Sequence, residues 1–188
     1  MVLAINSVRS KDALIEIINR GEQPKYIFFW GHQKSKAESV TKTCFSQWYE
    51  ASFDVESDHY LTAEHFMMAK KAELFGDIEI KNKILKAKDP GKAKALGRLV
   101  DGFDHEVWLK HRWDIVVQAN IHKFQQNLRL KEYLLSTQSR VLVEASPVDQ
   151  IWGIGLDAAS PFAELPEKWQ GLNLLGFALM EVRSLVSE

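Results

Sequence analysis

The segment WLKHRWDIVVQANIHKF, residues 108–124, is the longest helical pattern in this chain of 188 residues. One row of side chains at helical spacing is typical of a packing face and consists of Leu109, Trp113, Val116, Asn120 and Phe124. A second row begins at Trp108 and includes Arg112, which suits the edge of a pocket better than the middle of a core. The pattern continues to Leu128 or beyond, so it predicts one long helix.

Shorter helical patterns lie on both sides of this segment. The N-cap candidates and the patterns that they open are Thr62 with AEHFMMAKKAELF, Asp77 with IEIKNKILKA, and Asp89 with the segment that starts at Pro90. Residues 10–20 form a short amphipathic pattern, KEYLLST adds one or two turns, and LNLLGFALMEVRSLV carries an apolar stripe. The sequence therefore predicts five or six helices.

Two short runs rich in β-branched and aromatic residues predict strands: YIFFW, residues 26–30, and VLVEA, residues 141–145. The polar segment GHQKSKAESVTKT after the first run predicts a surface loop. We expect a mainly α fold of the α+β class, a single compact helical domain with two to four short strands. Residues 1–25 are expected to form an N-terminal helical appendage, and residues 26–188 the domain itself.

The composition argues against several classes of protein. Hydrophobic residues make up 46% of the chain and the formal net charge is −1 with both signs interspersed, so tight binding of nucleic acid is not expected. Cys44 is the single cysteine, which excludes an internal disulfide and a metal site built from several cysteines. The sequence shows no signal-peptide pattern and no run of about 20 apolar residues, so we expect a cytoplasmic protein without a membrane span.

Two charged residues lie on the apolar face of the helix that follows Thr62. Glu64 and Lys71 share helical spacing with four apolar residues, Met67, Met68, Leu74 and Phe75. Burying an ion is costly unless it is paired, so a carboxylate and an ammonium on this face need a reason. One reason is a cleft lined by both groups. The other is that Lys71 extends to solvent while Glu64 complements the helix dipole. The pattern alone leaves both interpretations open.

The segment ASPVDQIWGIG follows the second predicted strand. A proline ends that strand, so Asp149 and Trp152 are expected on a loop at a strand end, where binding sites commonly lie. Gly153 and Gly155 would let the backbone approach a ligand closely or adopt positive φ. The spacing is not that of a phosphate-binding loop, because no lysine follows and GxGxxG is absent. The loop thus supplies an acid and a flat ring at one place, with simple turn chemistry as the alternative.

Six segments occur in the order found in the NADAR, or YbiA-like, N-glycosidases, and the chain resembles that family from about residue 27 to residue 185. They are FSQWYEASF, TAEHFMMAKK, DPGKAKALGR, Trp108 with the later HKF and LLST, EASPVDQIWGIG, and NLLGFALMEVR. The resemblance implies that residues 26–188 form a NADAR domain. It also implies hydrolysis of an N-glycosidic bond between ribose and a base, as in the phosphoribosylamino-pyrimidine intermediates of riboflavin biosynthesis.

The resemblance also assigns site residues. The family's acidic and aromatic site positions fall on Glu64, Trp108, Asp149 and Trp152, and a family lysine falls on Lys71. It implies that Glu64 and Asp149 are the catalytic carboxylates. One would stay ionised and stabilise the cationic sugar or activate water, while the other donates a proton at the base. The two tryptophans would hold the planar base.

Other residues would complete this site. Phe45 would assist the tryptophans, Gly153 would allow close approach of the backbone, and Arg98 and Lys71 are candidates for binding phosphate. Lys71 has an alternative role as a catalytic amine that forms a transient imine with the opened sugar. Neither a metal nor a redox cofactor is implied. The expected partner is a small phosphoribosyl or ADP-ribosyl substrate, and no obligate protein partner is evident.

Two other functions remain open from the sequence. One is a hydrolase that removes ADP-ribose from ADP-ribosylated guanine, which would use the same pocket on another substrate. The other is a module that binds ADP-ribose or NAD without cleaving it. Loss of the two acids from the site would favour this interpretation. Both acids are present here, so we expect an enzyme, a hydrolase acting on N-glycosyl bonds.

Overall fold

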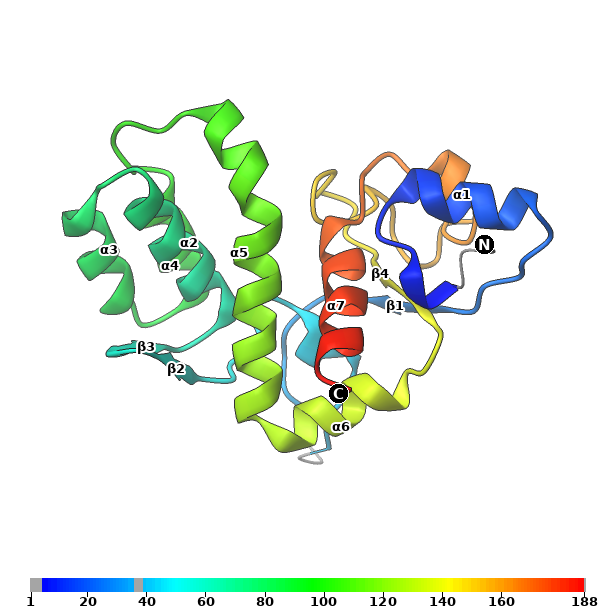
Figure 1. Ribbon diagram of the computed structural model, residues 1–188, viewed down its shortest axis with the longest axis horizontal. Helices are drawn as coiled ribbons and strands as arrows, with labels where there is room; N and C mark the ends of the chain where they lie inside the picture. Colours follow the sequence, from blue (N-terminus) through cyan, green and yellow to red (C-terminus); the bar gives the residue numbers. More distant parts are fainter. Residues whose placement is uncertain (1–4, 36–38, 188) are drawn as a thin grey trace. The chain divides into compact units, whose positions relative to one another are not determined.

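The computed structural model describes residues 5–35 and 39–187, and within these ranges the chain forms seven α-helices and four β-strands (Figure 1). The chain divides into two compact units. Unit 1 combines Met1–Ser46 with Arg129–Glu188, and unit 2 is the intervening segment Gln47–Leu128. The predicted mainly α, α+β class is confirmed, with one or two more helices than predicted. No helix of the described ranges has the length and apolar character that crossing a membrane requires.

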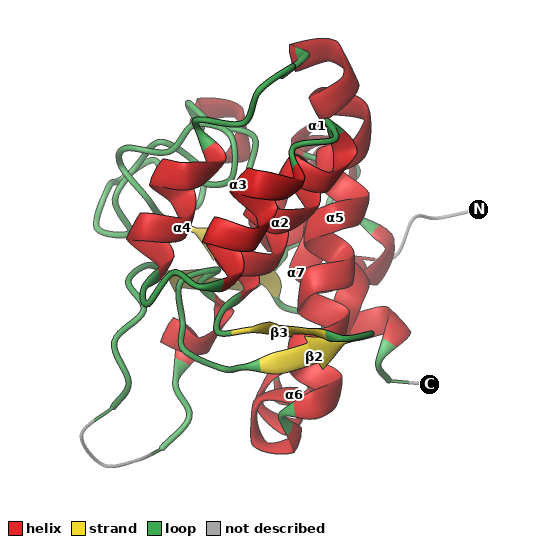
Figure 2. Cartoon of the chain, turned by 90° about the vertical axis from the view of Figure 1, so that its left-hand side faces the viewer, coloured by secondary structure: helices red, strands yellow, loops and turns green. Residues whose placement is uncertain are grey.

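Unit 2 consists of four helices and one hairpin: α2 (Ala63–Leu74), α3 (Ile78–Leu85), α4 (Pro90–Gly97), α5 (His105–Gln126), β2 (Phe53–Val55) and β3 (Asp58–Tyr60). Helix α2 contacts α3, α4 and α5, and every residue from Ala63 to Ala69 is buried. The hairpin lies below α2 in the view of Figure 2. Helix α2 is therefore the core helix of this unit, and of its two candidate site residues Glu64 is buried and Lys71 is half-buried.

The predicted helix starts in unit 2 are confirmed by side-chain caps. The cap oxygens accept a backbone N–H three residues on, over 3.4 Å at Thr62, 3.0 Å at Asp77 and 2.8 Å at Asp89. Asp104 caps α5 in the same way over 2.9 Å, so this helix begins a few residues before the apolar pattern does. Each cap satisfies an N–H that has no partner inside its helix, which is why these starts can be read locally.

The hairpin β2–β3 is not evident from the sequence, because each strand has only three residues. Phe53 pairs with Tyr60 across the hairpin and their rings stack at 5.7 Å. Phe66 of α2 packs against both rings, with centroid distances of 5.9 and 5.0 Å. Aromatic packing against α2 therefore holds the hairpin in place, and strands this short show no usable alternation of polar and apolar residues.

Unit 1 is built on two parallel strands, β1 (Tyr26–Phe29) and β4 (Val141–Glu144). Both fall on the predicted strand segments. Their register pairs Tyr26 with Val141 and Phe29 with Glu144. Helix α6 (Leu128–Ser136) precedes β4, and α7 (Leu174–Leu185) packs against it. The loop ASPVDQIWGIG leaves the carboxyl end of β4, as predicted.

Helix α7 lies unusually close to β4. Asn173, just before α7, accepts the N–H of Glu144 at Oδ1 over 2.9 Å and donates from Nδ2 to the carbonyl of Leu142 over 3.0 Å. A Cβ atom on Gly176 would lie 2.0 Å from the same Leu142 oxygen, so a larger residue would force helix and strand apart. These contacts fix the end of β4 from which the loop departs.

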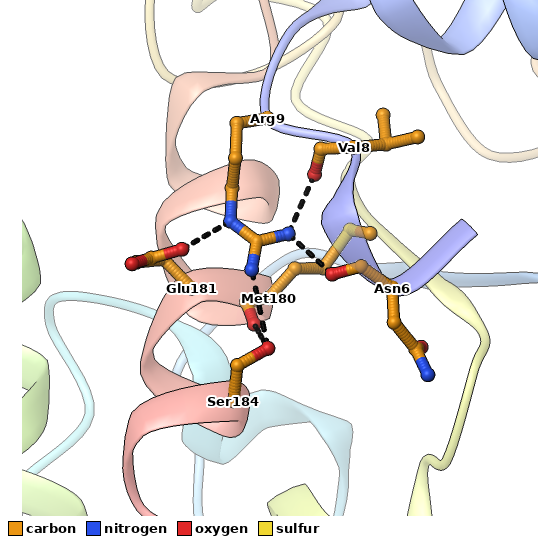
Figure 3. Close-up of polar contacts among 6 residues, drawn as sticks. All are labelled: Asn6, Val8, Arg9, Met180, Glu181 and Ser184. Carbon is orange, nitrogen blue, oxygen red and sulfur yellow. Dashed lines mark hydrogen bonds and ion pairs between the residues drawn. The ribbon is translucent and has the colours of Figure 1, made fainter. Parts of the chain in front are cut away.

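The N-terminal segment is attached to α7 by Arg9, whose contacts are drawn in Figure 3. Its Nε donates to the carboxylate of Glu181, and its Nη2 donates to Ser184 Oγ over 3.1 Å. Its Nη1 donates to the carbonyls of Asn6 and Val8. Helix α1 (Lys11–Asn19) follows, within the predicted helical range, and buries Leu14 and Ile17 in unit 1.

Candidate active site

The first candidate acid, Glu64, occupies the first turn of α2. Glu64 is only 5% exposed, and its backbone N–H donates to the carbonyl of Gln47 over 3.0 Å. The bond to Gln47 fixes the position from which the Glu64 side chain leaves the helix. A carboxylate withdrawn from water in this way is a candidate for chemistry as well as for dipole compensation.

Lys71 lies two turns further along α2, and three groups surround its ammonium. Nζ donates to the carbonyl of Gly97 over 2.8 Å, lies 4.2 Å from the ring centroid of Phe103 and lies 5.8 Å from that of Trp108. None of these groups is a carboxylate, and burial lowers the pKa of Lys71. The ammonium is therefore held by a carbonyl dipole and two aromatic faces rather than extended freely to solvent.

Trp108 and Arg98 lie near the same part of unit 2. Trp108 is 9% exposed and lies in the first turn of α5, where its backbone N–H donates to the carbonyl of Asp104 over 3.0 Å. Arg98 directly follows Gly97, the residue whose carbonyl holds Lys71, and is exposed. Lys71 and Trp108 thus lie near one another, and Phe103, which no sequence pattern singled out, lies beside them.

The second candidate acid, Asp149, organises the loop after β4. Its Oδ1 accepts the backbone N–H groups of Ile151 and Trp152, each over 2.8 Å, and its own carbonyl accepts the N–H of Gly155 over 3.1 Å. Both side-chain bonds use the same oxygen. A carboxylate held in this place suits the role of a base or of a stabilising anion.

The two glycines of this loop are required by the backbone, and close approach of a ligand at Gly153 stays a prediction. Gly155 has a φ of +69°, a conformation that favours glycine. A Cβ on Gly153 would lie 2.8 Å from the carbonyl oxygen of Glu144, so Gly153 is needed where the loop crosses the end of β4. Trp152, just before Gly153, is half-buried, and its carbonyl accepts the N–H of Leu175 over 3.1 Å. The tryptophan is thereby tied to the start of α7.

Phe45 lies in the core of unit 1. Its residue is 0% exposed, and its ring lies 5.5 Å from the rings of Phe29 and Tyr133. These contacts give the residue a packing role. Contact between Phe45 and a substrate stays a prediction.

Two amides near Glu64 belong to the candidate site although the sequence did not single them out. Asn120 of α5 donates from Nδ2 to Gln47 Oε1 and to the carbonyl of Val116, each over 2.8 Å. Gln47 is the residue whose carbonyl receives the Glu64 N–H. A signal was available, because Asn120 is the one polar member of an otherwise apolar helical row and Gln47 lies inside FSQWYEASF.

Comparison with known proteins identifies the family. The NADAR domain model matches residues 28–187. The chain belongs to the NADAR family. An N-glycosidase of Acanthamoeba polyphaga mimivirus is 45% identical over 168 residues, which cover 86% of this chain and 96% of that protein.

Two more similarities extend this comparison. A riboflavin biosynthesis protein of Vibrio vulnificus is 32% identical over 76% of this chain and 35% of its own length. The NMR structure of the E. coli protein YbiA matches with a TM-score of 0.69 and 25% identity, covering 88% of this chain and 87% of that one. The fold of this NADAR chain is thus that of YbiA.

The candidate residues of this NADAR protein fall in both units. Unit 2 holds one acid, the lysine, one tryptophan and the arginine: Glu64, Lys71, Trp108 and Arg98. Unit 1 holds the other acid, the second tryptophan, the loop glycine and the buried phenylalanine: Asp149, Trp152, Gly153 and Phe45. The joint action of the two acids on one substrate stays a prediction.

Proposed function

We propose that this NADAR protein is an N-glycosidase that hydrolyses the ribosyl C–N bond of phosphoribosylamino-pyrimidines. The observation that carries the proposal is the similarity to a mimivirus protein named as an N-glycosidase, which extends over 96% of that protein's length. The similarity to a riboflavin biosynthesis protein supports the choice of substrate class. A buried acid on α2, with an aromatic cluster two turns away, suits a site for a sugar joined to a flat base.

The reaction needs a small set of groups. The C1′–N bond breaks with its electron pair going to the base nitrogen, which takes up a proton, while water adds to C1′ and loses a proton. The products are ribose 5-phosphate and the free amino-pyrimidine. The transition state is oxocarbenium-like, so a carboxylate near C1′ and a proton donor at the base nitrogen both lower the barrier.

We assign these roles from the surroundings of the two acids. Asp149 is held in the loop after β4 by two N–H groups that donate to Oδ1, and it acts as the base that takes a proton from water. Glu64 is buried at the start of α2 and acts as the acid that protonates the departing base. Trp108 and Trp152 provide flat surfaces for the base.

Besides binding substrate electrostatically, Lys71 can act in the same reaction as a nucleophilic amine. Burial lowers its pKa, which raises the fraction of neutral amine at a given pH. A neutral amine can attack C1′ as the base leaves, forming an imine with the opened sugar that water then hydrolyses. Sodium borohydride added during turnover reduces such an imine to a stable amine. A ribose 5-phosphate adduct on Lys71 in peptide mass spectra would establish this role, and an unmodified Lys71 would leave it with electrostatic binding alone.

The test of the proposed function compares substrates directly. We expect the wild-type protein to release the base from a phosphoribosylamino-pyrimidine, and Glu64→Gln to lower that rate about 100-fold because the proton donor is lost. ADP-ribosylated guanosine and ADP-ribose are assayed beside it. Release of ADP-ribose from ADP-ribosylated guanosine, with no release of pyrimidine from the first compound, would replace the proposed substrate. Binding of ADP-ribose without any product would replace the enzyme by a binding module.

A further inference from the structure

The amide pair formed by Gln47 and Asn120 is incompletely satisfied. Its one mutual bond runs from Asn120 Nδ2 to Gln47 Oε1 over 2.8 Å. The other two polar atoms, Gln47 Nε2 and Asn120 Oδ1, are buried and have no hydrogen-bond partner among the described residues. Asn120 is 0% exposed and Gln47 is 8% exposed. A buried amide atom left without a partner costs about 1–3 kcal/mol, so such atoms are rare in folded proteins and call for an explanation.

The two unsatisfied atoms are complementary. Gln47 Nε2 is a donor and Asn120 Oδ1 is an acceptor. Each belongs to the same amide group as an atom of the mutual hydrogen bond, so the free donor and the free acceptor lie on two directly hydrogen-bonded amides. A hydroxyl group can accept from the first and donate to the second at the same time. One hydroxyl would therefore satisfy both amides.

The position of the pair indicates which part of a substrate it meets. The carbonyl of Gln47 receives the N–H of Glu64, so the pair lies at the start of α2. Trp108 lies near Lys71, which is seven residues further along the same helix, or about 10 Å at 1.5 Å per residue. The aromatic surface that suits a base is thus at one end of this helix, and the amide pair with Glu64 is at the other.

We propose that Gln47 and Asn120 form the ribose subsite and bind the 2′-hydroxyl, which is the hydroxyl next to the reacting carbon. Gln47 Nε2 donates to the hydroxyl oxygen and Asn120 Oδ1 accepts its proton. The inference rests on the proposed function, because it takes Glu64 to act beside C1′. It assigns a direction to the substrate, with the sugar at the start of α2 and the base toward Lys71 and Trp108.

Calorimetry with two sugar phosphates tests this subsite without requiring turnover. Ribose 5-phosphate and 2-deoxyribose 5-phosphate are titrated into the wild-type protein and into Gln47→Met, which keeps the volume of the side chain but removes the donor. We expect wild type to bind the ribose compound about tenfold more tightly, since one buried hydrogen-bonded group is lost in the deoxy compound. Gln47→Met should bind both equally.

A matched control lies on α5. Gln126 is an exposed amide that bonds the backbone of Asp54, and Gln126→Met makes the same chemical change away from Glu64. This variant should keep the tenfold preference. Asn120→Leu, which removes the acceptor, should lose it, and thermal unfolding shows whether each variant is folded.

The outcomes separate this inference from the proposed function. Equal binding of the two sugars by wild type, no binding of either, or an unchanged preference in folded Gln47→Met overturns the ribose subsite. Failure of wild type to release base while the preference for ribose holds overturns the proposed reaction and leaves the subsite standing. If the two amides instead hold a structural water, Gln47→Met should be less stable than wild type but should keep the same sugar preference. That result also overturns the ribose subsite.

Discussion

Single atoms decide how the candidate residues of each unit are held. In unit 1, the absence of a Cβ at Gly153 and Gly176 lets backbone segments meet at the end of β4. In unit 2, a carbonyl oxygen at Gly97 fixes the Lys71 ammonium against the aromatic rings. The sequence predicted the importance of Glu64, Lys71 and the loop glycines, because charge on an apolar face and closely spaced glycines are local signals. The free amide atoms of Gln47 and Asn120 depend on contacts between distant segments, so no local pattern shows them.

Replacement of Gly176 by alanine tests the close approach of α7 and β4. The new Cβ would lie 2.0 Å from the Leu142 carbonyl oxygen, a backbone atom that cannot move aside cheaply. We expect Gly176→Ala to lower the free energy of unfolding by about 3 kcal/mol. Chemical denaturation measures this. The control is Gly91→Ala in α4, where the nearest atom is 3.2 Å away and belongs to the Asp89 side chain, and it should change stability far less.

Replacement of Asp149 by asparagine separates charge from loop geometry. The amide oxygen of asparagine can still accept the N–H groups of Ile151 and Trp152, so the loop should keep its conformation. The negative charge and the basic oxygen are lost, so we expect base release to fall about 100-fold or more with little change in unfolding temperature. Asp149→Ala should lower both the rate of base release and the unfolding temperature. Full activity in the asparagine variant would show that the carboxylate has only a structural role.

At the scale of the elements, helix starts were predictable and strand pairing was not. Thr62, Asp77 and Asp89 each cap a helix through atoms three residues away, so a short stretch of sequence carries the whole signal. The parallel pairing of β1 with β4 joins segments far apart in the chain. The hairpin β2–β3 is held by packing on α2 rather than by its own pattern.

The start of α2 should be sensitive to acid through His65. This imidazole is buried, with Nδ1 at 2.8 Å from Thr62 Oγ1 and Nε2 at 3.1 Å from the Ala87 carbonyl. Burial lowers the pKa of His65 below its usual 6.5, although the Ala87 carbonyl and Asp89 oppose this shift. The folded state therefore prefers neutral imidazole. The resulting stability is complete above pH 6.5 and is lost as pH falls through the pKa of the folded state.

Unfolding in urea at a series of pH values measures this effect. Wild type should lose stability as pH falls below 6.5, and His65→Gln should lose less over the same range. Equal slopes in wild type and His65→Gln would contradict the assignment.

At the scale of the whole molecule, the sequence predicted one compact domain and the family that it resembles. The matched range 28–187 confirms the family and includes every candidate site residue. The division into two units was not predicted, because unit 2 is inserted between the two segments of unit 1 without any change in composition to mark the boundaries. Each unit holds one of the two acids that we propose as catalytic.

The central claim is that Glu64 and Asp149 act in one reaction, and a double-mutant cycle on base release tests it most directly. Rates from a phosphoribosylamino-pyrimidine are measured for wild type, Glu64→Gln, Asp149→Asn and the double variant. If both acids act on the same step, each single variant loses about 100-fold or more, and the double variant loses much less than the product of the two losses. A wild-type rate in either folded single variant, or losses that simply multiply, would contradict the claim.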